Sequence, residues 1–110
     1  MKRIDKDGIC IITLEIKKLD ITNAATFGAQ MAKHIDGSMD YIVDLRNIRF
    51  MDSSGLGKII ESIRMAKEKG KKIVFCNIGD AVKVLFSMVN LSQIAVLRGT
   101  VAEAEQYIKA

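Results

Sequence analysis

The sequence predicts a single α/β domain, spanning residues 1–110, with a mixed, mainly parallel β-sheet and about four helices. Short apolar segments alternate along the chain with segments that repeat at helical spacing, which is the pattern of an α/β layer. A middle segment is apolar on both faces, as expected of a strand covered on both sides. The length of 110 residues, 49% of them hydrophobic, suits one core. The expected order is β-β-α-β-α-β-α-β-α, with right-handed crossovers.

The N-terminal segment is predicted to form a β-hairpin. A short first strand covers Arg3 to Lys6, and Asp7-Gly8 supplies the turn. The β-branched run from Ile9 to Ile16 is typical of a second strand.

A first helix is predicted after Lys17-Lys18-Leu19-Asp20, with Asp20 or Thr22 as its N-cap. Gly37 is expected to end it. The residues that recur at helical spacing are Ala24, Phe27, Gly28, Met31 and Ile35. The next segment, Tyr41 to Leu45, is the one that is apolar on both faces and predicts a central strand.

A second helix is predicted after the connection Arg46 to Met51 and the run Asp52-Ser53-Ser54-Gly55-Leu56-Gly57. Gly70 closes it. Its apolar stripe consists of Leu56, Ile59, Ile60 and Ile63. A further strand then covers Lys72 to Cys76.

The C-terminal part predicts a third helix after Asn77 to Asp80, a short strand from Ile94 to Leu97, and a final helix. The core-facing residues of the third helix are Val82, Leu85, Phe86 and Val89. Val84 falls roughly opposite this stripe, because successive helical residues are about 100° apart. Thr100-Val101-Ala102-Glu103 is a capping box that opens the last helix.

The charge of +4 does not by itself indicate nucleic-acid binding. The basic residues are dispersed, and their densest run, Lys67 to Lys72, contains Glu68 and lies where a helix should end, a position that suits cations. No aromatic residues alternate with them to stack on bases. We therefore expect no direct nucleic-acid partner.

The two cysteines, Cys10 and Cys76, lie inside apolar runs without metal-binding spacing, and we expect buried free thiols in a reducing compartment. The acidic residues near the N-terminus are not typical of a signal peptide, and no apolar stretch approaches the ~18 residues of a membrane span. The sequence thus predicts a soluble cytoplasmic protein without a membrane partner.

Catalytic motifs are missing. The single histidine, His34, lies in the first predicted helix opposite its apolar stripe, which favours a surface position over a catalytic one. Gly57-Lys58 resembles the end of a phosphate-binding loop, but that motif requires Gly at position 52 and Ser or Thr at 59, where the chain has Asp52 and Ile59. We expect no enzyme activity, no cofactor and no metal site.

The polar cluster Asp52-Ser53-Ser54-Gly55 has two interpretations. The simpler one is a helix N-cap, because Asp and Ser side chains accept hydrogen bonds from the first free N–H groups. One cap needs only one residue, however, and three candidates occur. Gly55 and Gly57 follow, each costing about 0.5–1 kcal/mol relative to Ala. The alternative is an open docking surface beside two hydroxyls, at a helix start that tolerates phosphate.

The chain resembles the STAS domain family (sulphate transporter and anti-sigma factor antagonist), in particular the stand-alone bacterial anti-sigma factor antagonists. The resemblance lies in Phe50 to Gly57 with the preceding Tyr41 to Leu45, and extends to Leu19-Asp20 and to Ala81 to Phe86. It departs from the family at Lys17-Lys18, where members often have Gly and a charged residue.

The resemblance implies a binding switch. In the family, the second serine of the D-S-S-G motif, here Ser54, is phosphorylated by an ATP-using anti-sigma factor serine kinase, while the antagonist itself has no cofactor. The unphosphorylated form would bind that kinase and release a sigma factor. Phosphorylation would abolish binding, and a phosphatase acting on phospho-Ser54 would restore it. The expected partner-binding residues are Asp20, Asp52, Ser53, Ser54, Gly55, Leu56, Gly57 and Val84.

Other functions stay open at this point. A STAS domain can act as an unphosphorylated interaction subunit of a larger signalling or lipid-transport assembly. The domain of an anion transporter is disfavoured, because no membrane part is present in the sequence. A small enzyme or a nucleic-acid binder is the least favoured.

Overall fold

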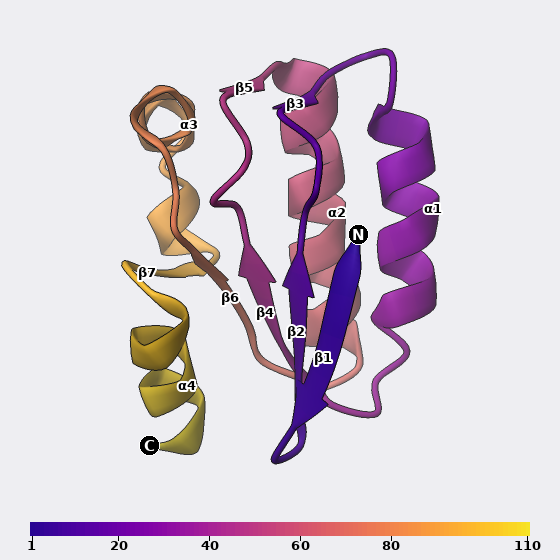
Figure 1. The fold of residues 1–110 in the computed structure, drawn as a ribbon, viewed down its shortest axis with the longest axis vertical. Helices are drawn as coiled ribbons and strands as arrows, with labels where there is room; N and C mark the ends of the chain where they lie inside the picture. Colours follow the sequence, from indigo (N-terminus) through magenta and orange to yellow (C-terminus); the bar gives the residue numbers. More distant parts are fainter.

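The computed structural model describes all 110 residues, and its main feature is a five-stranded sheet (Figure 1). The strands lie in the order β1-β2-β4-β6-β7. Their bounds are β1 Lys2–Lys6, β2 Ile9–Thr13, β4 Asp40–Asp44, β6 Ile73–Cys76 and β7 Val96–Arg98. β1 is antiparallel to β2, and all the other pairs are parallel. The prediction of a mixed, mainly parallel sheet is confirmed.

Four α-helices accompany the sheet, as predicted. They are α1 Ala24–His34, α2 Ser53–Glu68, α3 Asp80–Met88 and α4 Val101–Lys109. Two features were not predicted: a small parallel pair of two-residue strands, β3 Lys18–Leu19 with β5 Phe50–Met51, and a 3₁₀ turn, η1 Leu91–Gln93. In Figure 1 the β3–β5 pair lies with α3 and the first turn of α2 at one end of the molecule, beyond the carboxyl ends of the parallel strands.

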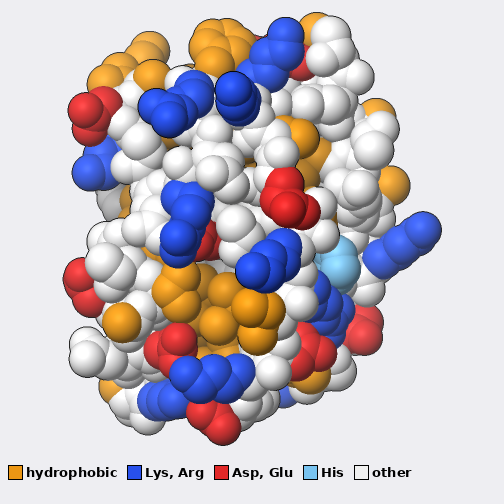
Figure 2. All heavy atoms as spheres, viewed as in Figure 1, with side chains coloured by type: hydrophobic (Ala, Val, Ile, Leu, Met, Phe, Trp, Pro, Cys, Tyr) orange, Lys and Arg blue, Asp and Glu red, His pale blue; other side chains and the backbone are white.

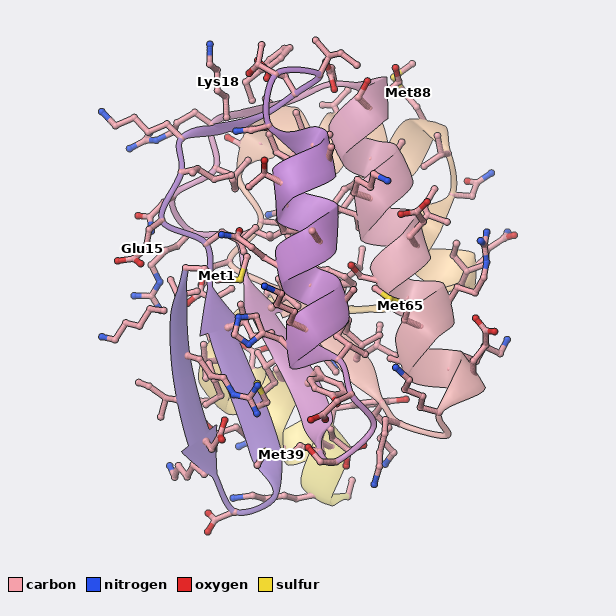
Figure 3. All side chains as sticks on the ribbon, turned by 90° about the vertical axis from the view of Figure 1, so that its right-hand side faces the viewer. Met1, Glu15, Lys18, Met39, Met65 and Met88 are labelled. Atoms are coloured by element: carbon pink, nitrogen blue, oxygen red, sulfur yellow. The ribbon has the colours of Figure 1, made fainter.

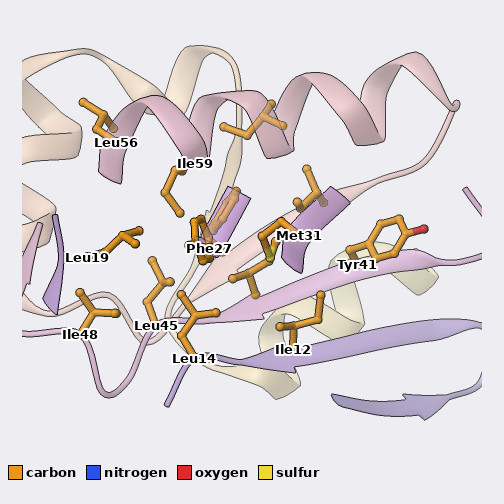
Figure 4. Close-up of a cluster of buried hydrophobic side chains, with 14 of the residues drawn as sticks. Ile12, Leu14, Leu19, Phe27, Met31, Tyr41, Leu45, Ile48, Leu56 and Ile59 are labelled. Atoms are coloured by element: carbon orange, nitrogen blue, oxygen red, sulfur yellow. The ribbon is translucent and has the colours of Figure 1, made fainter. Parts of the chain in front are cut away.

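The core has two layers, because consecutive residues of a strand point to opposite faces of the sheet. On β4, Tyr41 and Val43 belong to the larger cluster, which lies on the side of α1 and α2, whereas Ile42 belongs to the smaller one under α4. Figure 4 shows the larger cluster, in which Phe27 and Met31 of α1 meet residues of the strands and of α2. The prediction that this segment is apolar on both faces is thus confirmed.

The opening hairpin is confirmed, but its second strand is shorter than predicted. Asp7 and Gly8 both have positive φ, 54° and 79°, as two-residue hairpin turns require. β2 ends at Thr13 instead of Ile16. The N–H of Leu14 still donates to the carbonyl of Asp44 at 3.2 Å, and the chain then runs on to β3.

The predicted N-cap of the first helix is wrong. α1 begins at Ala24, and Asn23 holds the cap position without a side-chain cap bond. Asp20 instead closes the preceding turn by accepting the N–H of Thr22 at 2.9 Å. Asn23 is used in the same loop, accepting from the N–H of Asp20 and donating to the carbonyl of Lys18, each at 2.9 Å. The helix therefore starts one to three residues later than the sequence pattern indicates.

The C-terminal half differs from prediction at two apolar positions. Val82 and Phe86 of α3 are buried and Leu85 is half-buried, but Val89 is 45% exposed because the helix ends at Met88. Ile94 is 55% exposed and precedes β7 rather than lying in it. The capping box is confirmed, since the Thr100 hydroxyl accepts the N–H of Glu103 at 3.1 Å.

Both thiols are buried and unpaired, as predicted. Burial raises the pKa of Cys10 to about 11 and that of Cys76 to about 12. A thiol that stays protonated near neutral pH is a poor nucleophile and a poor metal ligand. None of the helices combines the length and the apolar composition that crossing a membrane would require.

Candidate functional site

The N-terminus of α2 is organised by Asp52. One carboxylate oxygen accepts the N–H of Gly55 at 3.0 Å, which makes Asp52 the N-cap of the helix. The other accepts the N–H of Ile21, also at 3.0 Å, from the loop between β3 and α1. The capping interpretation is therefore correct for Asp52. Its second hydrogen bond adds a connection that the sequence did not indicate.

The two serines that follow are not needed for capping. Ser53 is exposed and Ser54 is half-buried, and both lie in the first turn of α2. The first N–H groups of a helix have no partners within it, and the helix dipole makes this end favourable for anions. The hydroxyls of Ser53 and Ser54 therefore lie beside backbone N–H groups that can donate hydrogen bonds to a phosphate.

The two glycines of this turn differ in their surroundings. A Cβ added to Gly57 would meet nothing within 4 Å. A Cβ on Gly55 would lie 2.5 Å from the carbonyl oxygen of Leu19 and 2.8 Å from its Cγ. The expectation of an open surface thus agrees with the structure at Gly57 and is wrong at Gly55, which is closed off by β3. Leu56, only 7% exposed, likewise belongs to the core.

Exposed apolar side chains lie at the same end of the molecule as the start of α2, on β5, on the loop after β3 and on α3, which packs against β5. Val84 and Met88 of α3 are 61% and 76% exposed, which confirms that Val84 points away from the helix stripe. Phe50 of β5, 53% exposed, and Ile21, 74% exposed, lie on the neighbouring elements. In Figure 3, Met88 and Lys18 stand at the same end of the molecule. Figure 2 shows hydrophobic atoms beside Lys and Arg along this edge.

Asp20 lies in the loop that Asp52 fixes. Its carboxylate accepts from the Thr22 backbone and hydroxyl, and Lys18 Nζ is 3.8 Å away. These hydrogen bonds from Thr22, first of all from its hydroxyl, hold the pKa of Asp20 below its usual value. Asp20 is one residue from Ile21 and is therefore brought close to the start of α2.

Sequence reasoning missed Asp44. Its carboxylate, 1% exposed at the end of β4, accepts three hydrogen bonds, from the Arg46 N–H, the Arg46 Nε and the Asn77 side chain, and forms an ion pair with Arg46 Nη2 at 2.6 Å. The side-chain hydrogen bond to Asp44 raises the pKa of the Arg46 guanidinium above its usual value. The available signal was a lone acidic residue inside a strand that is otherwise apolar. Asp44 fixes the beginning of the connection that leads to β5, and so contributes to the position of Phe50.

His34 is not part of this site. It lies at the last turn of α1, the opposite end of that helix from the start of α2 (Figure 1). Its Nδ1 lies 3.1 Å from Arg3 Nη1, so the neutral ring accepts from the guanidinium. Burial, together with the nearby charge of Arg3, lowers the pKa of His34. No three His, Cys, Asp or Glu side chains come together in a way that could hold a metal ion.

The chain is similar to known proteins of one family. A model of the STAS domain matches residues 2–104. An anti-sigma-B factor antagonist of Staphylococcus aureus is 30% identical over 59 residues, which are 54% of this chain and 55% of that protein. The chain thus spans about half the length of the curated relative that it matches.

Two solved structures share the fold. An anti-sigma-factor antagonist (STAS) domain protein from Planctomyces limnophilus superposes with a TM-score of 0.90 at 13% identity, covering 99% of this chain and 97% of that one. The anti-sigma factor antagonist SpoIIAA in its unphosphorylated form superposes with a TM-score of 0.72 at 18% identity, again covering 99% and 97%. At these identities the likeness establishes the fold alone.

Proposed function

The chain belongs to the STAS domain family, and from that membership we propose that it acts as an anti-sigma factor antagonist switched by phosphorylation at Ser54. The unphosphorylated form binds an anti-sigma factor serine kinase and thereby releases a sigma factor. The S. aureus relative, described as an anti-sigma-B factor antagonist, supports this function.

One observation supports the proposal most directly. Asp52 alone caps α2, which leaves the hydroxyls of Ser53 and Ser54 without a capping role. A serine used as a cap would lose its structural bond on phosphorylation. Ser54 can instead receive a phosphate without loss of the cap, at a helix end whose N–H groups favour anions.

The proposed docking surface consists of the first turn of α2 with Ile21, Phe50, Val84 and Met88 around it. These four side chains are each more than half exposed and lie at one end of the fold. Gly57 is open, so a partner's backbone can approach the helix closely there. Asp20 and Ser53 border this surface, whereas Gly55 and Leu56 are buried beneath it, Gly55 directly against Leu19 of β3.

Phosphorylation would act on binding rather than on folding. It adds about −1.5 to −2 charges and a bulky group next to Asp52. In a closely packed interface the new charge must be desolvated and is repelled by the carboxylate of Asp52. Each ~1.4 kcal/mol of this penalty lowers affinity tenfold. The proposed partners are therefore an ATP-using serine kinase and a phosphatase for phospho-Ser54, in the cytoplasm, and the chain itself is a substrate and not an enzyme.

The test is phosphorylation by a candidate anti-sigma kinase with ATP, followed by intact-mass and tandem mass spectrometry. We expect a single phosphate on Ser54 and none on Ser54→Ala, while Ser53→Ala is labelled like the wild type. Equal labelling of Ser53, or labelling that survives Ser54→Ala, would sink the assignment. Tight binding to the kinase without any labelling would favour the unphosphorylated interaction subunit of a larger assembly.

A further inference from the structure

Lys58 lies one turn beyond Ser54 on the same side of α2. Residues at positions i and i+4 are neighbours on a helix surface, and side chains lean toward the helix N-terminus. The turn that contains Ser54 is therefore within reach of the Lys58 side chain, whose ammonium group in this structure pairs instead with Glu61, on the C-terminal side. Glu61, at i+7 from Ser54, shares this side of the helix, and its Oε2 lies 3.1 Å from Lys58 Nζ.

The stem of Lys58 is held in the seam between α1 and α2. A Cβ added to Gly28 of α1 would lie 2.8 Å from Lys58 Cδ and 3.3 Å from its Cε. The absence of a side chain at Gly28 thus leaves a channel that the lysine stem occupies. The side chain is 33% exposed, so the stem is packed while the ammonium group can exchange partners.

We infer that Lys58 breaks its ion pair with Glu61 and binds the phosphate of phospho-Ser54. This inference rests on the proposed phosphorylation at Ser54 and names the residue of this chain that responds to it. The packed stem limits where the ammonium group can go, and both candidate anions, Ser54 phosphate and Glu61, lie within one side of the helix.

The exchange is favoured by charge and by direction. The phosphate has about −1.5 to −2 charges, against one on a carboxylate. An anion N-terminal to a lysine at i,i+4 has the better orientation relative to the helix dipole. Glu61 is 50% exposed, so water replaces the lysine at little cost. Lys58 and the first N–H groups of α2 then contact the phosphate together.

Four other charged groups lie on the elements around Ser54. Asp52 caps α2 and Glu61 lies within it, whereas Lys18 and Asp20 come from β3 and the loop after it. The near part of α1 contributes no charge, because its basic residues Lys33 and His34 lie in its last turn. A substitution at Lys58 alone leaves all of these groups unchanged, so any difference in the pKa of the phosphate is due to Lys58.

The experiment uses the full chain with phosphoserine installed at position 54 by semisynthesis, so that no kinase is needed. The ³¹P chemical shift is titrated from pH 4.5 to 8 to obtain the second pKa of the phosphate. We expect this pKa to be about 0.7 of a unit higher in Lys58→Met, the size expected for a unit charge roughly 4 Å away in water. Lys58→Arg should keep the wild-type value, because the cation is retained.

Lys67→Met is the matched control, since it removes the same charge from the last turn of the same helix. It should leave the titration unchanged, and circular dichroism of each variant verifies the fold. Identical titrations of wild type and Lys58→Met would overturn the inference. Its outcome is separate from that of the proposed function: a kinase that never labels Ser54 refutes the latter, whereas the installed phosphoserine tests Lys58 in either case.

Discussion

The pair Gly55→Ala and Gly57→Ala separates a packed glycine from an open one within one helical turn. Both substitutions gain the same intrinsic helix propensity, up to about 1 kcal/mol. At Gly57 the new methyl group meets nothing within 4 Å, so this gain should appear as added stability of about 0.5–1 kcal/mol. Gly57→Ala therefore serves as the matched control for Gly55→Ala.

At Gly55 the methyl group meets the backbone of β3. Its distance to the Leu19 carbonyl oxygen would be 2.5 Å, whereas ordinary C···O contacts begin at about 3.3 Å, so helix and strand must separate by roughly 0.8 Å. Met51 Cγ, at 3.0 Å, closes the other side. Overpacking of this kind costs about 1–3 kcal/mol. When the gain in helix propensity is subtracted from this cost, the free energy of unfolding of Gly55→Ala should be lower than that of the wild type by about 1–2 kcal/mol.

The measurement is thermal and urea unfolding of both variants beside the wild type. The two melting temperatures should differ by about 5–10 °C, with Gly57→Ala the higher. The difference isolates the steric effect, because the helix propensity cancels. Equal stability of the two variants would refute the argument that β3 seats the start of α2 through Gly55.

Three further predictions concern the same end of the molecule. Val84→Lys should keep the fold, because Val84 is 61% exposed, and should weaken kinase binding several-fold in calorimetry. The control Ile94→Lys, at a residue 55% exposed before β7, should bind the kinase normally. Equal affinities of the two variants for the kinase would remove α3 from the interface. Ser54→Asp should weaken kinase binding while shifting the melting temperature little, since an acidic residue near a helix N-terminus is worth a few tenths of a kcal/mol; a large drop would mean that Ser54 is structural. Asp44→Ala should destabilise the fold by about 2 kcal/mol in urea titration, because it leaves Asn77 and the Arg46 backbone N–H without their acceptor, and a loss under 0.5 kcal/mol would contradict this role.

The individual strands of the main sheet, the four helices and the start of α2 could be predicted because each depends on residues close together in the chain. The period of apolar residues, the Asp7-Gly8 turn and the Thr100 capping box are local signals of this kind. Even so, the local pattern overestimated α3: it includes Val89, yet the helix ends one residue earlier and leaves Val89 exposed.

Features that depend on distant pairs could not be predicted. β3 and β5 have two residues each, too few for any period, and they exist because Lys18 and Leu19 meet Phe50 and Met51. The same pairing closes the space over Gly55, which sequence reasoning left open. Asp44 has no periodic signal either, since its partner Asn77 is 33 residues away.

The β3–β5 pair has a consequence for local unfolding. It is joined by few backbone hydrogen bonds, among them Phe50 N–H to the Lys17 carbonyl at 3.3 Å and Asp52 N–H to the Leu19 carbonyl at 3.2 Å. Regions with few such bonds open more readily than the centre of a sheet. The amides of Ile21 and Asp52 should therefore exchange with deuterium well before those of β4. A partner that binds both strands would slow that exchange. The exchange rate would therefore reveal binding of the partner without a label on either protein.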